Sequence, residues 1–175
     1  MKRLNKCVLA VAVGVCATAS LSAMAEPVLR DYTINAAGNC NGALPSFEGA
    51  LRKRPTAIAN EGASSAFVTC SLAGNFLNDG NNVVVAIFTN NSAAEVSFNC
   101  TFVDGYSAGI GGGSVFNPQT VTIAAGMPGA VIWEPAEGEL FSNNANVSCA
   151  LPAGVEINAL EIQFEEDNGV EPPAP

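Results

Sequence analysis

Apolar and polar residues alternate with a period of two along much of the chain. In residues 96–102, V-S-F-N-C-T-F, the apolar side chains and Cys100 fall on one side, whereas Ser97, Asn99 and Thr101 fall on the other. Such alternation predicts β-strands in sheets that have one face toward a core and one toward water. The same period recurs in residues 68–72, 119–125, 129–134, 146–151 and 155–164.

Two of these expected strands call for a finer prediction. Residues 83–89, V-V-V-A-I-F-T, are apolar on both faces, which favours a central strand covered by another layer. In residues 155–164, Glu161 and Gln163 are expected on the outer face. The inner face of that strand is expected to carry Asn158, Leu160, Ile162 and Phe164.

Turn-forming residues separate the alternating segments. N-D-G-N-N lies at 78–82, T-N-N-S at 89–92, A-A-G-M-P-G at 124–129 and L-P-A-G at 151–154. About eight short strands with turn residues between them indicate a single all-β domain. We expect an antiparallel β-sandwich, Ig-like or jelly-roll-like, with a small β-barrel as the alternative.

The N-terminus has the three parts of a secretory signal peptide. Lys2, Arg3 and Lys6 precede an apolar run, and small residues at 23–25 favour cleavage between Ala25 and Glu26. We therefore expect a leader at 1–25, a β-sandwich at 26–167 and a disordered acidic, proline-rich tail at 168–175. The mature protein is expected to be secreted, to the periplasm or the extracellular space. No run approaches the ~20 apolar residues of a membrane span.

Loss of the leader makes the chain strongly acidic. Three of the seven Lys and Arg residues leave with it, so four basic residues face sixteen acids and the net charge is 4 − 16 = −12. A surface of this charge repels nucleic acid phosphates and anionic lipids. We therefore expect no nucleic acid partner and no membrane span; a protein or carbohydrate partner and the oligomeric state stay open.

The mature chain keeps four cysteines: Cys40, Cys70, Cys100 and Cys149. An even number in an exported chain predicts two disulfides, which can be connected in three ways. The spacings and the absence of histidine exclude a zinc site of the usual kind. Because Cys100 and Cys149 are central in inward strand faces, Cys100–Cys149 with Cys40–Cys70 is the favoured pairing. Cys40–Cys149 with Cys70–Cys100 is the alternative.

The order of these cysteine motifs resembles a group of short exported bacterial proteins whose function is unknown. The resemblance rests on a cysteine in an N-terminal loop, an I-A-N-E-G segment, then V-T-C-S-L, F-N-C-T-F and V-S-C-A-L-P. It spans about residues 34–165, and it implies a disulfide-containing β-sandwich and export. Such relatives often have Pro where this chain has Ser71, and the group has no known activity to carry over.

Catalytic residues of the common kinds are missing from the sequence. Without histidine there is no Ser-His-Asp or Cys-His site, and Lys53, the lysine left for a Ser-Lys dyad, lies between Arg52 and Arg54. A carboxylate-based hydrolase is the remaining enzymatic alternative, although no two of the sixteen acids can be chosen as its pair. We expect a non-catalytic protein.

Calcium is the one cofactor that the sequence leaves as a weak alternative to none. Asp79, Asn81 and Asn82 offer oxygen ligands in one turn, and residues 165–167 form an acidic run. Neither segment matches the twelve-residue calcium loop.

Two function classes follow. The first is a secreted binding or accessory module of unknown ligand. The second is a structural subunit of a surface layer or fibre, in which residues 28–35, V-L-R-D-Y-T-I-N, are donated as a strand to the next copy. Trp133 would be the first residue to test for sugar stacking, but Val131 shares its face and we predict that Trp133 lies in the core.

Overall fold

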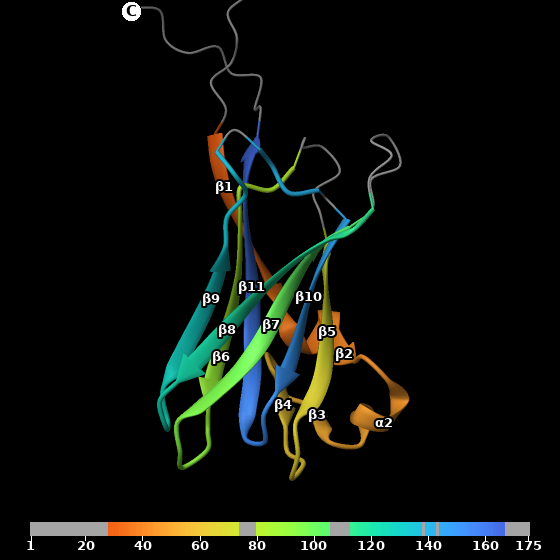
Figure 1. Ribbon diagram of the computed structural model, residues 1–175, viewed down its shortest axis with the longest axis vertical. Helices are drawn as coiled ribbons and strands as arrows, with labels where there is room; N and C mark the ends of the chain where they lie inside the picture. Colours follow the sequence, from red (N-terminus) through yellow and green to blue (C-terminus); the bar gives the residue numbers. More distant parts are fainter. Residues whose placement is uncertain (1–27, 74–79, 106–112, 138, 143, 167–175) are drawn as a thin grey trace, which may run out of the picture.

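Two antiparallel β-sheets packed face to face make up the computed structural model (Figure 1). It describes residues 28–73, 80–105, 113–137, 139–142 and 144–166; the expected leader at 1–25 and tail at 168–175 lie outside them. The elements are β1 (Val28–Asn35), α1 (Ala36–Asn39), β2 (Cys40–Gly42), α2 (Pro45–Glu48), β3 (Leu51–Lys53), β4 (Ile58–Asn60), β5 (Ala66–Ala73), β6 (Val83–Asn90), β7 (Val96–Asp104), β8 (Val115–Ile123), β9 (Pro128–Trp133), β10 (Asn144–Leu151) and β11 (Val155–Glu166).

The chain passes repeatedly between the two sheets. Sheet A has the strand order β3-β4-β11-β6-β9, with β1 also paired to β11, and sheet B has the order β2-β5-β10-β7-β8. Successive strands therefore often lie in different sheets, as in β4 to β5, β6 to β7, β8 to β9 and β10 to β11. In Figure 1, β7 and β8 of sheet B run obliquely across the nearly vertical β6 and β11 of sheet A. The antiparallel sandwich expected from the alternation is confirmed.

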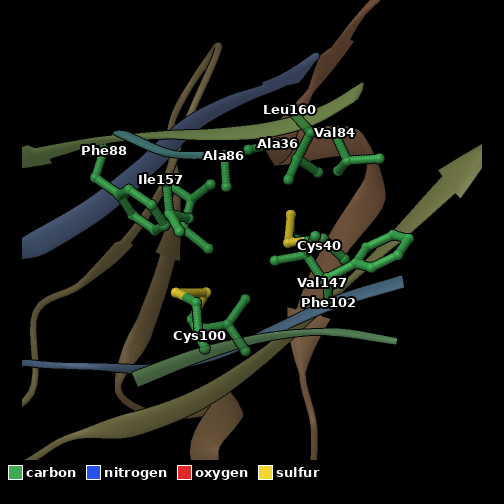
Figure 2. Close-up of a cluster of buried hydrophobic side chains, with 14 of the residues drawn as sticks. Ala36, Cys40, Val84, Ala86, Phe88, Cys100, Phe102, Val147, Ile157 and Leu160 are labelled. Carbon is green, nitrogen blue, oxygen red and sulfur yellow. A yellow bond between two sulfur atoms is a disulfide. The ribbon is translucent and has the colours of Figure 1, made fainter. Parts of the chain in front are cut away.

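The core lies between the sheets and is built from the inward half of each alternating strand. Figure 2 shows Val84, Ala86 and Phe88 of β6 facing Phe102 of β7 and Val147 of β10 across this layer. Aromatic rings fill one part of it, since the Phe102 ring centroid is 4.4 Å from that of Phe141 and 5.9 Å from that of Trp133. Burial of these apolar surfaces is the main favourable term in the stability of such a fold.

Both disulfides lie within sheet B and face the core. Cys40 is bonded to Cys70 between β2 and β5, and Cys100 to Cys149 between β7 and β10. In each pair the two cysteines are directly opposite each other in the strand register, and all four are fully buried. The crosslinks therefore join neighbouring strands of one sheet and do not connect the two sheets. The prediction of two disulfides is confirmed.

The inward face of β11 differs from the prediction at Asn158. The register against β6 shifts between Ile157 and Ala159, which marks a β-bulge. Ile157 before the bulge and Leu160 after it are both fully buried. The Asn158 side chain instead bonds to Thr89 and Glu156, whose strand faces point outward. The placement of Asn158 with Leu160 was wrong because the extra residue reverses the alternation.

The two faces of β6 differ in burial. Val84, Ala86 and Phe88 are buried in the core, but Val85 and Ile87 are only half-buried on the outer face. Among the described residues, no further layer of helices or strands packs on that side of sheet A. The prediction of a central strand covered by another layer is confirmed: β11 and β9 flank β6 within sheet A, and sheet B covers its inner face.

The segment that the fibre alternative would donate is paired inside its own chain. β1 pairs with β11 over eight residues, from Val28 opposite Glu166 to Asn35 opposite Ala159. Only Ile34 and, in the helix that follows, Ala36 are buried from this region. In the described residues no helix is both long and apolar enough to cross a membrane.

Candidate functional site

Sheet B is almost free of charged residues. Its five described strands contain a single one, Asp104, at the end of β7. Asp104 lies on the inward parity of that strand, and its Oδ1 accepts a hydrogen bond from the backbone N–H of Ser142 (2.9 Å). Nothing charged therefore extends from the outer side of these strands, although the chain has sixteen Asp and Glu residues.

We call the outer side of sheet B the uncharged face. Its side chains alternate with the buried core positions and are exposed or half-buried. Most carry a hydroxyl or an amide. They are Asn41 of β2, Phe67, Thr69 and Ser71 of β5, Asn144, Asn146, Ser148 and Ala150 of β10, Ser97, Asn99, Thr101 and Val103 of β7, and Phe116, Pro118, Thr120 and Thr122 of β8.

Cross-strand hydrogen bonds order the hydroxyls and amides of this face. The hydroxyls of Thr69 and Ser148 are 3.1 Å apart across β5 and β10. Thr120 Oγ1 donates to Asn99 Oδ1 (2.9 Å) across β8 and β7. Each hydroxyl can donate and accept at once, so these groups keep capacity for a ligand while they fix one another.

The register places several of these residues in one row across the sheet. Thr69 is opposite Ser148, and Ser148 is opposite Thr101. At the two margins of the sheet, Asn41 of β2 is opposite Thr69, and Pro118 of β8 is opposite Thr101. This row, Asn41–Thr69–Ser148–Thr101–Pro118, crosses all five strands.

Two exposed phenylalanines stand at opposite corners of the uncharged face. Phe116 on β8 is 66% exposed, and Phe67 on β5 is 46% exposed. The Phe67 ring leans on Phe47 of α2, with ring centroids 6.4 Å apart and planes inclined at 41°. Exposed aromatic rings are costly unless a partner covers them, so their position on an otherwise polar face points to a contact surface.

The layer beneath the uncharged face holds it in one shape. The two disulfides tie β2 to β5 and β7 to β10, directly under the outward residues of the same strands. β5 and β10 are paired over eight positions, and β7 and β8 over nine. A surface fixed in advance loses less conformational entropy when it binds a ligand.

Charged residues gather on sheet A and its margins. Glu61 accepts hydrogen bonds from Arg52 Nε (3.3 Å) and Arg54 Nη2 (2.7 Å), and Lys53 Nζ donates to Asn41 Oδ1 (2.8 Å) at the margin of the uncharged face. The basic side chains of residues 52–54 are thus exposed and bonded to acceptor oxygens. Lys53 bonds to the side-chain amide of Asn41 and not to a serine, as a Ser-Lys dyad would require. A small open pocket beside it is lined by Gly49, Ala50, Leu51, Arg52 and Glu61.

Trp133 lies in the core, as its strand pattern predicted. It is 2% exposed, and its Nε1–H donates to the carbonyl oxygen of Asn117 (2.9 Å). Ile132, which precedes it, points outward and is 51% exposed. Trp133 therefore offers no stacking surface for a ligand on the outside of the protein.

Of the candidate calcium ligands, the structure brings Asn82 of the turn and Glu165 of the acidic run together. Asp79 and Asp167 lie outside the described residues. The backbone N–H of Asn81 bonds to Phe141, whereas that of Asn82 bonds to Gln163 in β11, so the two asparagines serve different neighbours. Asn82 Nδ2 also donates to Glu165 Oε1 (3.3 Å). No three His, Cys, Asp or Glu side chains in the described ranges form a group that could hold a metal ion.

The comparisons with known proteins give weak fold likenesses. No protein-family model and no curated protein matches the chain. A family 35 carbohydrate-binding module (CBM35) from Cellvibrio japonicus Abf62 is similar at TM-score 0.41 and 12% identity, over 76% of this chain and 92% of that one. A family 35 carbohydrate-binding module from Clostridium thermocellum is similar at TM-score 0.40 and 10% identity, over 79% of this chain and 98% of that one.

A third similar structure belongs to a larger protein. It is an exo-beta-1,3-galactanase from Phanerochaete chrysosporium, with a TM-score of 0.41 and 17% identity. The likeness covers 76% of this chain but only 29% of the galactanase chain. Similarities of this size transfer no ligand and no residue, so the function has to be argued from the uncharged face itself.

Proposed function

We propose that this protein is an exported, non-catalytic binding module that holds an uncharged ligand on the uncharged face. The observation that carries the proposal is the absence of charged side chains from the outward positions of the described strands of sheet B, in a chain with a net charge of −9. An acidic protein keeps like charges off a surface of this size at a cost in solubility. A surface that binds a neutral partner has a reason to lack charged side chains in spite of that cost.

Carbohydrate is the ligand class that we propose. Sugars are dense in hydroxyl groups, and Ser, Thr and Asn side chains match them because they donate and accept hydrogen bonds. Exposed phenylalanines offer apolar faces for the C–H groups of a sugar ring. The names of similar structures also contain carbohydrate-binding modules, although the proposal does not rest on them.

Two other occupants fit the face less well. The fully buried core of a protein–protein interface is depleted in charged residues, as this face is, but it is also depleted in Ser and enriched in Tyr, Trp, Phe, Met and Arg. The centre of this face is made of Ser, Thr and Asn, and its two phenylalanines stand at the corners. A second copy of the chain meets the same objection, since homodimer interfaces are more apolar than an average surface. For the fibre alternative, the segment that would be donated, β1, is already paired with β11 of its own chain.

The test is a charge placed at the centre of the uncharged face. Thr101→Lys introduces a long cation into the row that crosses all five strands. Thr33→Lys makes the same substitution on the outer side of β1 in sheet A, where Thr33 is exposed, and is the matched control. The exported protein and both variants are run by affinity electrophoresis through gels that contain neutral polysaccharides or an acidic polysaccharide such as polygalacturonate.

The expected result is retardation by at least one neutral polysaccharide, loss of that retardation in Thr101→Lys and its retention in Thr33→Lys. Polygalacturonate should not retard the acidic protein. No retardation by any neutral polysaccharide, or equal retardation of both variants, would contradict the proposal. Melting temperatures of the two variants show whether each remains folded.

A further inference from the structure

The two exposed phenylalanines define a direction across the uncharged face. Phe116 is opposite Val103, Val103 is opposite Asn146, and Asn146 is opposite Ser71. Phe116 is thus level with Ser71 on β5, and Phe67 lies four residues earlier on the same strand. The line between the two rings therefore runs diagonally over four strands.

The separation of the two phenylalanines follows from the spacing of strands. β8 and β5 are three strand intervals apart, about 14 Å, and four residues along a strand add about 13 Å. The diagonal is therefore about 20 Å long. One monosaccharide cannot contact both rings, whereas an extended chain of several sugar residues can.

The residues between the two rings suit an extended neutral chain. On the diagonal, β7 presents Thr101 and Val103, and β10 presents Ser148. These side chains are half-buried and cannot obstruct a ligand that lies along the surface. The hydroxyls in the middle of the diagonal can form hydrogen bonds with the hydroxyl groups of a sugar chain. The aromatic ring at each end can make apolar contact with a sugar ring.

The shape of sheet B selects a single chain over a flat lattice of chains. Strands in a sheet are rotated relative to one another, so β8 and β5 are not coplanar. Figure 1 shows this directly, because β8 is inclined much more strongly than β5. A single polysaccharide chain can twist to follow the uncharged face, whereas the flat surface of a crystalline polymer can contact only part of that face.

We infer that Phe116 and Phe67 are the two end contacts of a binding track for a single, extended, neutral polysaccharide chain, which lies diagonally over Thr101 and Ser148. The inference rests on the proposed function, since it assigns subsites within the same face. It makes chain length, and not only the kind of sugar, a determinant of affinity. It also predicts that the Phe116 and Phe67 rings raise the affinity only for ligands that are long enough to contact both rings at once.

The experiment measures binding of oligosaccharides by isothermal titration calorimetry, with the polysaccharide that retards the wild-type protein providing the series from disaccharide to hexasaccharide. For the wild type, affinity should rise with length until the ligand spans the diagonal and then level off. Phe116→Ala and Phe67→Ala should each weaken the longest ligand by about threefold to tenfold, the size of an aromatic contact. In both variants the advantage of long over short ligands should shrink.

Tyr32→Ala is the matched control. Tyr32 is an aromatic residue on β1 that is 52% exposed and lies outside the uncharged face, so its removal should leave every affinity unchanged. Melting temperature again shows that the variants are folded. Insoluble crystalline cellulose and chitin are tested in parallel by sedimentation and should deplete the protein less than the soluble chain does.

The outcomes separate this inference from the proposed function. If Thr101→Lys abolishes binding but affinity does not depend on length, or either phenylalanine can be removed without effect, the face binds sugar and the diagonal track is wrong. Preferential binding to a crystalline surface also contradicts the track. If no neutral polysaccharide binds, both the track and the proposed function fail.

Discussion

Asn60 and Asn90 occupy equivalent places in two successive crossings from sheet A to sheet B. Both are fully buried. The Nδ2 of each donates to the carbonyl oxygen four residues later, in Ser64 and Ala94, at 2.8 Å in both cases. The Oδ1 of each accepts from the backbone N–H two residues later, at 3.0 Å and 2.9 Å.

The equivalence extends beyond the turns themselves. Asn60 also donates to the carbonyl oxygen of Leu151 at the end of β10, and Asn90 donates to that of Ile123 at the end of β8. Cys70 and Cys100 each follow their asparagine by ten residues. The β4–β5 and β6–β7 units are therefore repeats of one corner, in which an asparagine ties a crossing to a neighbouring strand end.

Replacing either corner asparagine should destabilise the protein strongly. Asn60→Ala and Asn90→Ala each leave buried backbone groups without partners, and we expect a loss of about 2 to 4 kcal/mol in the free energy of unfolding. Urea denaturation followed by circular dichroism measures it. Asn91→Ala, at an exposed neighbouring position, should change stability by less than about 0.5 kcal/mol. Similar values for Asn90→Ala and Asn91→Ala would show that the corner bonds do not matter.

Removing a disulfide should also lower stability, by an amount set mainly by the length of chain that it closes. The sequence separations are 30 for Cys40–Cys70 and 49 for Cys100–Cys149. The loop-entropy relation gives about 4 kcal/mol for each, slightly more for the longer loop. The measurement is urea denaturation of the paired variants Cys40→Ala with Cys70→Ala and Cys100→Ala with Cys149→Ala. A loss below about 1 kcal/mol in both would contradict this expectation.

Trp133 should report on the core and not on the ligand. Its emission should be blue-shifted and poorly quenched by acrylamide, and saturating polysaccharide should not change it, because the indole is 2% exposed. Trp133→Phe removes the hydrogen bond to Asn117 and part of the packing against Phe102, so we expect a destabilisation of about 1 to 3 kcal/mol. Binding measured by calorimetry should stay the same. A shift of Trp133 emission when the polysaccharide is added would indicate that the ligand does not bind on the uncharged face.

Export is tested by the mass of the mature protein. Expression of the full chain in a bacterium and mass spectrometry of the periplasmic and secreted fractions should give a polypeptide that begins at Glu26. Replacing Ala25 with a bulky residue, as in Ala25→Leu, should slow cleavage and leave precursor in the membrane fraction. An intact N-terminus on the abundant soluble form would contradict the signal peptide prediction.

The period of two was enough to predict the longer strands and the inward residues of β7. It places Phe98, Cys100 and Phe102 on one side of β7, and all three are buried in the structure. It could not predict the bulge in β11, since one extra residue between Ile157 and Ala159 leaves no mark in the composition. The three-residue strands β2, β3 and β4 were missed, so the structure has eleven described strands where about eight were expected, and Cys40 lies in β2 and not in a loop. The one-turn helices α1 and α2 were missed because four residues are too few to show a helical stripe.

The uncharged face was not predicted, although its parts were visible. Ser97, Asn99 and Thr101 were recognised as outward residues of one strand, but nothing in the chain shows that this strand lies beside β10 and β8. Strands of the two sheets alternate in sequence, so the outward residues of sheet B are interrupted by those of sheet A. Only the strand order shows that the outward residues of sheet B, which carry no charge, lie together on one face, whereas the charged residues of the strands lie mainly in sheet A.

The pairing of β1 with β11 has a mechanical consequence. Val28 is opposite Glu166 in the register of β1 and β11, so the first residue of β1 and the last residue of β11 lie side by side at the same end of these two strands. A pulling force applied between them loads the β1–β11 hydrogen bonds one after another, as in a zipper, and does not shear all of them together. Neither disulfide crosses this pair of strands. Under tension β1 should therefore peel away at low force, while sheet B and the face that it carries keep their shape.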